Sequence, residues 1–142
     1  MMLASSAEAQ AATVPLEGFQ QFEWMLGRWR GAGAGALAGV GEFHEEYVLV
    51  NDSTVLMRAY ERAPFAAATD STRFEYRNGR IQAVPSRGST RFVTGVVGDT
   101  VVWDGGVRYV RLSNDHWRAL FPPRANDSRA MYYDMRRMPP GH

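Results

Sequence analysis

From Gly41 onward the chain alternates between short strand-like segments and turn residues, and this pattern constrains its fold more than any other feature. Between Thr72 and Arg77, Phe74 and Tyr76 share one face and charged residues occupy the other. Asn78-Gly79 follows, a dipeptide typical of two-residue β-hairpin turns. The same reasoning predicts strands at 42–50, 54–62, 72–77, 81–84, 89–97, 100–103, 107–112, 116–121 and 129–138, with a turn at Asn51-Asp52 between the first two.

Nearly all of these segments are joined by connections of hairpin length, which favours a closed barrel over a two-layer sandwich. A Greek-key sandwich needs one or two long crossings between its sheets. Closure also removes the open edges at which strands rich in apolar residues would pair with other chains. We therefore expect an all-β fold, an antiparallel up-and-down β-barrel of about eight to ten strands with a short N-terminal helix closing one end.

The predicted helix lies before the first strand. Apolar residues recur every three or four positions from Leu16 to Leu26, which predicts a short amphipathic helix within 14–26. A glycine-rich stretch at 31–39 follows. It is read as the end of the first strand, a loose turn and the start of the second strand, and a flexible loop is the alternative.

The junction between the helix and the first strand reads Phe22-Glu23-Trp24-Met25-Leu26-Gly27-Arg28-Trp29-Arg30-Gly31. Its Gly27-Arg28-Trp29 resembles the Gly-x-Trp motif of the lipocalin and calycin group. The longer segment resembles the start of nitrobindins and of bacterial lipocalin-like domains of unknown function, and the order of elements agrees over 19–138. This resemblance implies a structural latch in which Arg136 or Arg137, from the last strand, covers Trp29 and joins the ends of the barrel.

The resemblance also bears on haem. Nitrobindins place a haem-ligating histidine in their final strands, just before the closing segment. Ala130 and Met131 stand at that place here, with no histidine nearby. Methionine in such a strand is usually core filler. We therefore expect no haem and no other cofactor.

His44-Glu45-Glu46 is the densest ionisable cluster within a predicted strand. Alternation puts Glu45 on the face of its apolar neighbours, so Glu45 lies inside the barrel if that face points inward. A buried carboxylate needs a partner or a raised pKa, and Arg58 or Arg111 is the expected partner. The functional interpretation is a polar anchor or a general base in a ligand pocket. The alternatives are a structural ion pair, or the reverse facing with Glu45 in solvent.

Aromatic residues recur at mid-strand positions, where alternate side chains face inward. In a small barrel such rings fill the interior, whereas a barrel of ten strands leaves room for an aromatic-lined cavity. Cavity and solid core therefore compete. If there is a cavity, the residues expected to bind its ligand are Glu45, Tyr47, Arg58, Tyr60, Phe74, Tyr76, Trp103, Arg111, Trp117 and Tyr133.

Composition excludes several function classes. A formal net charge of +1 gives no electrostatic reason to expect a nucleic-acid partner. The chain has no cysteine, its His44 and His116 are far apart in sequence, and neither a Gly-x-Ser-x-Gly elbow nor a P-loop occurs. We therefore expect no metal site and no catalytic residue of those kinds, and no segment is apolar enough for a membrane span.

A length of 142 residues suits one domain, which we place at 14–142. Residues 1–13 are small and polar and are read as a disordered tail or the remnant of a signal peptide. Ala9-Gln10-Ala11 resembles a cleavage site, which would make the protein periplasmic or secreted; a frayed terminus on a cytoplasmic protein is the alternative.

These observations predict a protein that binds or carries a small hydrophobic ligand in the barrel cavity without catalysing a reaction. An acid/base enzyme on the same barrel, with Glu45 or with His44 and Glu46 as the titrating group, is the first alternative. A domain without a pocket, serving structure or protein contacts, is the second. The oligomeric state is left open.

Overall fold

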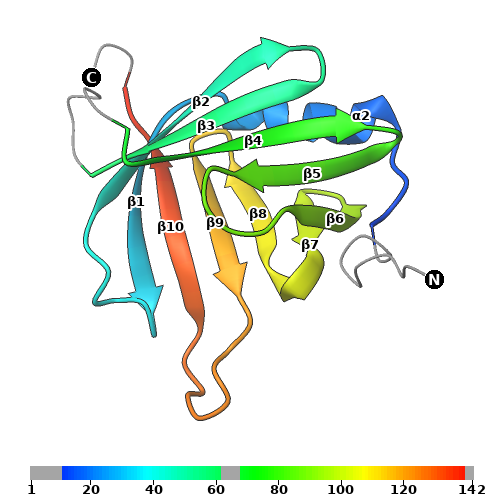
Figure 1. The fold of residues 1–142 in the computed structure, drawn as a ribbon. Coiled ribbons are helices and arrows are strands. Elements are labelled where there is room, and N and C mark those ends of the chain that lie inside the picture. The colour runs from blue at the N-terminus through cyan, green and yellow to red at the C-terminus, as the bar shows by residue number, and fades with distance from the viewer. Residues whose placement is uncertain (1–10, 62–67, 140–142) are drawn as a thin grey trace.

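The computed structural model describes residues 11–61 and 68–139, and within them it confirms a closed antiparallel barrel. Ten strands form a single sheet in which each pairs with its neighbours in the chain and β1 pairs with β10 (Figure 1). Two short helices precede β1, and a single 3₁₀ turn follows β7. The elements are α2 Leu16–Phe19, η1 Gln20–Met25, β1 Gly27–Gly35, β2 Phe43–Asn51, β3 Thr54–Tyr60, β4 Asp70–Arg77, β5 Arg80–Pro85, β6 Arg91–Val97, β7 Thr100–Trp103, η2 Asp104–Gly106, β8 Arg108–Ser113, β9 His116–Phe121 and β10 Met131–Arg137.

The predicted single helix over 14–26 is in fact two pieces, of which the second and longer is a 3₁₀ helix. Three residues per turn align side chains spaced by three, and Phe19, Phe22 and Met25 have that spacing. All three are buried in the barrel core. The helical segment therefore closes one end of the barrel as expected, with a tighter winding than the sequence indicated.

Arg137 is the latch between the two ends of the barrel. Its guanidinium carbon lies 4.3 Å from the centroid of the fully buried Trp29 ring. The guanidinium also donates hydrogen bonds to the carbonyl oxygens of Leu26 and Trp24, each at 2.7 Å. Arg136 points outward, where its Nε bonds Asp134. Of the two candidates, Arg137 is thus the residue over Trp29, and placing Arg136 there is wrong.

The glycine-rich stretch contains the second half of β1, which pairs with β10 as far as Gly35 opposite Met131. The pairing of β1 with β2 ends earlier, at Gly31 opposite Phe43. A β-carbon on Gly31 would lie 2.5 Å from the Phe43 ring, so glycine lets that ring cross the strand. The second strand begins only at Phe43, after the stretch has ended.

The described chain contacts the barrel on both sides of residue 14, where the domain is predicted to begin. The N–H groups of Ala12 and Val14 donate hydrogen bonds to the carbonyl oxygens of Val93 and Gly79, so Ala12 is already attached to the barrel. Residues 1–10, which include Ala9 and Gln10 of the predicted cleavage motif, lie outside the described residues, as does position 62 at the end of one predicted strand.

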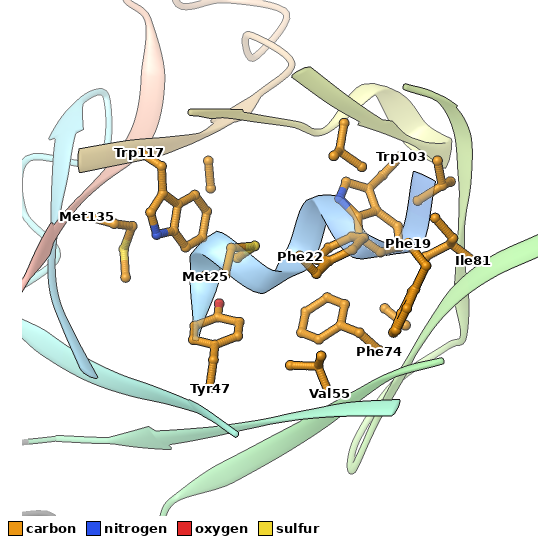
Figure 2. Close-up of a cluster of buried hydrophobic side chains, with 14 of the residues drawn as sticks. Phe19, Phe22, Met25, Tyr47, Val55, Phe74, Ile81, Trp103, Trp117 and Met135 are labelled. Carbon is orange, nitrogen blue, oxygen red and sulfur yellow. The ribbon is translucent and has the colours of Figure 1, made fainter. Parts of the chain in front are cut away.

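Inward-facing aromatic side chains make up most of the core. Figure 2 shows the rings of Tyr47, Phe74, Trp103 and Trp117 pointing into the barrel, with the helical segment across its end. Phe22 of that segment packs against Phe74 and Trp103, with centroids 5.4 and 6.1 Å away. The helical segment therefore covers the rings at the closed end, and open space remains beyond them.

Candidate functional site

A cavity of about 240 Å³ occupies the barrel interior beyond the helical segment. Side chains from eight of the strands line it, and most of them are apolar. Small residues, Ala83 and Ala119 among them, stand between the rings and leave the space unfilled. The aromatic residues that border it are Phe43, Tyr47, Phe74, Tyr109, Trp117, Phe121 and Tyr133. Of the two predicted alternatives, an aromatic-lined cavity and an interior filled by side chains, the described residues form the cavity.

Neighbouring rings hold one another in place around this space. Tyr47 stacks on Phe74 with centroids 6.0 Å apart, and the rings of Tyr109 and Trp117 are 5.1 Å apart. Phe43 meets Tyr133 edge-on at 5.0 Å. Because ring pairs of this kind add stability beyond the area they bury, the cavity wall is preformed.

Glu45 is a carboxylate on the wall of this apolar cavity. It lies on the inner face of β2, in register with Trp29 of β1, as alternation predicted. The Tyr47 hydroxyl donates a hydrogen bond of 2.9 Å to its Oε1. Burial raises the pKa of Glu45 from 4.5 to about 7, and the hydrogen bond from Tyr47 offsets part of this rise. Near neutral pH, Glu45 is therefore able both to accept and to release a proton.

Two tyrosines border Glu45 and stay neutral. Burial and, after it, the Glu45 carboxylate raise the pKa of Tyr47 and that of Tyr109 above the ordinary value of 10.0. Their hydroxyl groups are therefore protonated throughout the physiological range and serve as hydrogen-bond donors.

Arg91 lies where the cavity adjoins a second hollow of about 330 Å³, and it lines both spaces. Its Nη1 is 3.1 Å from Oδ1 of Asp104, a buried carboxylate in η2. The other Asp104 oxygen accepts a 2.8 Å hydrogen bond from the Phe92 N–H. The side chain of Arg91 is 60% exposed, so this ion pair marks the solvent side of the cavity.

Half of the ten residues predicted to bind a ligand line the main cavity, namely Glu45, Tyr47, Phe74, Trp117 and Tyr133. Trp103 lines the adjoining hollow. Tyr76 faces inward but lies beneath the amino-terminal segment, where its hydroxyl donates to the Val14 carbonyl at 2.7 Å. That any of these residues binds a ligand stays a prediction.

The three remaining predicted residues, Arg58, Tyr60 and Arg111, line neither space. Arg58 is exposed on the outer face of β3, opposite Glu46. Tyr60 is buried, but its register with His44 places it on the same face as Arg58. The expectation that Arg58 and Tyr60 face inward is wrong. The predicted turn sets a pairing of β2 with β3 that differs by one residue from the pairing in the structure, and a shift of one residue moves each side chain to the opposite face of the sheet. Arg111 lies at the closed end, with its guanidinium 5.6 Å from the Trp24 ring centroid and a hydrogen bond to Asn114.

Several residues that line the cavity were not predicted, and the two with polar groups that bear on its chemistry are Tyr109 and Arg91. Alternation is the signal that could find Tyr109, because it shares the inner face of β8 with the predicted Arg111. Arg91 begins β6 directly after a connection, and the predicted strand began at residue 89. Its inward position follows from its register with Ala83, and nothing in the sequence sets that register.

Neither histidine among the described residues points into the cavity, so neither is placed to hold a haem there. His44 and His116 both lie on the outer face of the barrel, and His116 Nε2 is 2.6 Å from Asp134 Oδ1. In residues 11–61 and 68–139, no group of three or more His, Asp or Glu side chains is placed to hold a metal ion.

A scan against protein-family models finds none that matches this chain, and a search of curated proteins finds no relative. The closed barrel with its short amino-terminal helical segment is consistent with a lipocalin-like fold. Among the described residues, no helix has the length and apolar character needed to cross a membrane.

Proposed function

We propose that this protein binds a small hydrophobic ligand inside its barrel, as a divergent member of the calycin group. The observation that carries the proposal is the cavity of about 240 Å³, which is bordered by aromatic rings and contains one carboxylate, Glu45. Ligand sites are typically concave and apolar, with a small number of polar groups that fix the orientation of the bound molecule. The Gly27-Arg28-Trp29 motif and the Arg137 latch support the calycin assignment.

The size of the cavity favours a compact ligand. Pockets for drug-sized molecules usually measure roughly 300–1,000 Å³, and this cavity is slightly smaller. A single aromatic ring with a short substituent suits the space. The adjoining hollow beyond Arg91 offers room for an exposed extension of such a molecule.

The state of Glu45 favours a second candidate function, acid/base catalysis on a bound hydrophobic substrate. General acid/base groups work best when their pKa is near the working pH, and the pKa of Glu45 is about 7. Tyr47 holds the carboxylate and Tyr109 supplies a neutral hydroxyl nearby. Glu45 would then move a proton to or from the substrate.

The cavity is tested by filling it. Ala119 is buried and lines the cavity, so Ala119→Phe places a ring in the space. Ala32→Phe is the matched control, because Ala32 is exposed on β1 and lies in register with Asp134 on the outer face. With 2-phenylethanol as the probe, calorimetry should show binding to the wild type and to Ala32→Phe, and at least about tenfold weaker binding to Ala119→Phe. Equal binding by all three proteins would place the probe elsewhere and contradict the proposal.

The small molecules that copurify with the protein distinguish carriage from catalysis. Small molecules are extracted from wild-type protein and from Glu45→Gln after expression in the same host, and both extracts are compared by mass spectrometry. The same compound in both extracts supports carriage. An unaltered compound in Glu45→Gln and a product differing by a proton-transfer reaction in the wild type support the enzyme.

A further inference from the structure

The cavity has one negative charge that no positive group among the described residues balances. Glu45 and Arg91 are the charged side chains among its described lining residues. Arg91 is already paired with Asp104, which is buried and has no other cationic partner among the described residues. The Arg91–Asp104 pair is neutral as a whole, so an ionised Glu45 gives the site a net charge of about −1.

The surroundings of Glu45 leave room for a donor from a ligand. Tyr47 donates to Oε1, and no described residue donates to Oε2. The rings of Tyr47, Tyr109 and Trp117 line the same cavity as the carboxylate and pack on one another, with Trp117 6.3 Å from Tyr47 and 5.1 Å from Tyr109, centroid to centroid. Ring faces carry partial negative charge and attract cations, most strongly where water is excluded. A carboxylate among rings is a site for a positive charge attached to an apolar body.

We propose that the cavity takes a small organic amine, with its ammonium group donating to Glu45 and its apolar body packed among Tyr47, Tyr109 and Trp117. This inference rests on the proposed ligand-binding function and names the class of ligand. A neutral molecule of the same shape would leave the carboxylate uncompensated, and an anion would be repelled by it. Arg91 does not offset this, because its charge is already balanced by Asp104.

Such a site has a characteristic pH dependence. An ammonium group favours the ionised form of Glu45, whose pKa is about 7 in the ligand-free protein. The other titratable groups bordering the cavity are Tyr47, Tyr109, Tyr133 and Arg91. Tyr47 and Tyr109 stay protonated because their pKa values are raised, and an alkyl ammonium itself stays charged well above pH 8. The affinity for an amine should therefore rise roughly tenfold between pH 6 and pH 8.

The experiment is calorimetric titration with three probes of matched shape, 2-phenylethylamine, 2-phenylethanol and 3-phenylpropanoate, on the full chain at pH 8. The wild type should bind 2-phenylethylamine at least about tenfold more tightly than 2-phenylethanol. It should bind 3-phenylpropanoate most weakly of the three. Glu45→Gln should lose this preference and the pH dependence while still binding the alcohol. Glu46→Gln is the control, because Glu46 is on the outer face and pairs with Arg28 at 2.9 Å; it should behave like the wild type.

The outcomes separate the amine proposal from the cavity itself. If the alcohol binds as well as the amine, or if Glu45→Gln keeps the preference, the amine proposal is wrong and the apolar cavity stands. If 3-phenylpropanoate binds most tightly and Arg91→Gln abolishes its binding, Arg91 anchors the ligand and the site takes an organic anion instead of an amine. If none of the three probes binds, both the amine proposal and the ligand-binding function are contradicted.

Discussion

At the scale of single residues, Glu45 combines a cost to stability with a use in binding. An ionised carboxylate in an apolar interior is destabilising unless a partner compensates for its lost hydration. Here the partner is the neutral Tyr47 hydroxyl, and the pKa of Glu45 remains raised to about 7. A group that costs folding energy at neutral pH and stands on a cavity wall is typical of a functional site.

Because the folded state raises the pKa of Glu45, it binds this proton more tightly than the unfolded chain. Stability from this group is fully present below the unfolded pKa near 4.5 and is lost as the pH rises toward about 7. Gln at position 45 cannot ionise, so the variant does not lose this stability. The unfolding free energy of Glu45→Gln relative to that of the wild type should therefore increase by about 1–3 kcal/mol between pH 4.5 and pH 8. Urea unfolding of both proteins at those two pH values measures the difference. A constant difference would show that Glu45 titrates normally.

The inward facing of Glu45 was predictable, but its partner was not. Strand alternation placed Glu45 with Tyr47 on the apolar face of β2, and the structure agrees. A two-residue turn at Asn51-Asp52 would have set Glu45 opposite Arg58. In the structure the turn lies one residue later, between Asn51 and Thr54, and an irregularity before it sets Glu45 opposite Ala59. Register therefore decided the partner, and register depends on a bulge that carries no clear sequence signal.

At the scale of elements, the second half of β1 depends on glycine because the chain turns back onto it. A β-carbon on Gly33 would lie 2.0 Å from the carbonyl oxygen of Leu37 and 2.9 Å from the Val40 β-carbon. The obstacle is partly backbone, so no change of rotamer relieves it. The prediction that this stretch lies partly within a strand is confirmed. The reason for glycine at position 33 is the contact of β1 with Leu37 and Val40, which the sequence alone does not reveal.

Gly33→Ala should destabilise the protein by about 1–3 kcal/mol, since the turn at 36–40 must move away from β1. Gly39→Ala is the matched control: a β-carbon there meets nothing within 4 Å, and its backbone is not in the left-handed region. That change should stay within about 0.5 kcal/mol. Urea unfolding monitored by tryptophan fluorescence compares the two. Equal losses would mean that backbone entropy, and not the contact with Leu37, governs this strand.

Element boundaries were predicted well where the turn chemistry was strong and less well elsewhere. Asn78-Gly79 is the turn between β4 and β5, with both residues at positive φ as a tight hairpin requires. The short helix before β1 is confirmed, but its winding could not be predicted, because apolar residues spaced by three and by four both occur between Leu16 and Leu26. Burial of Phe19, Phe22 and Met25 on one side selected the tighter form.

At the scale of the whole molecule, the barrel is closed unevenly. The β1–β10 ladder that joins the ends of the chain has seven register pairs, from Trp29–Arg137 to Gly35–Met131, and the latch reinforces it. Between β5 and β6 only two pairs occur, Gln82–Phe92 and Ala83–Arg91. The amino-terminal segment spans this seam through the Ala12 and Val14 hydrogen bonds, running beside the strand ends before α2 in Figure 1.

This seam should open before any other part of the barrel, and it borders the cavity through Ala83 and Arg91. Amide hydrogen exchange should therefore be faster in β5 and β6 than in the β1–β10 ladder. Ala12→Pro removes the N–H that bonds Val93, and losing one such bond should accelerate exchange in β5 and β6 by roughly fivefold while leaving β1 and β10 unchanged. Ala11→Pro is the control, because the Ala11 N–H makes no hydrogen bond with the described residues. Uniform acceleration across all strands would show that the barrel opens as one unit and not first at this seam.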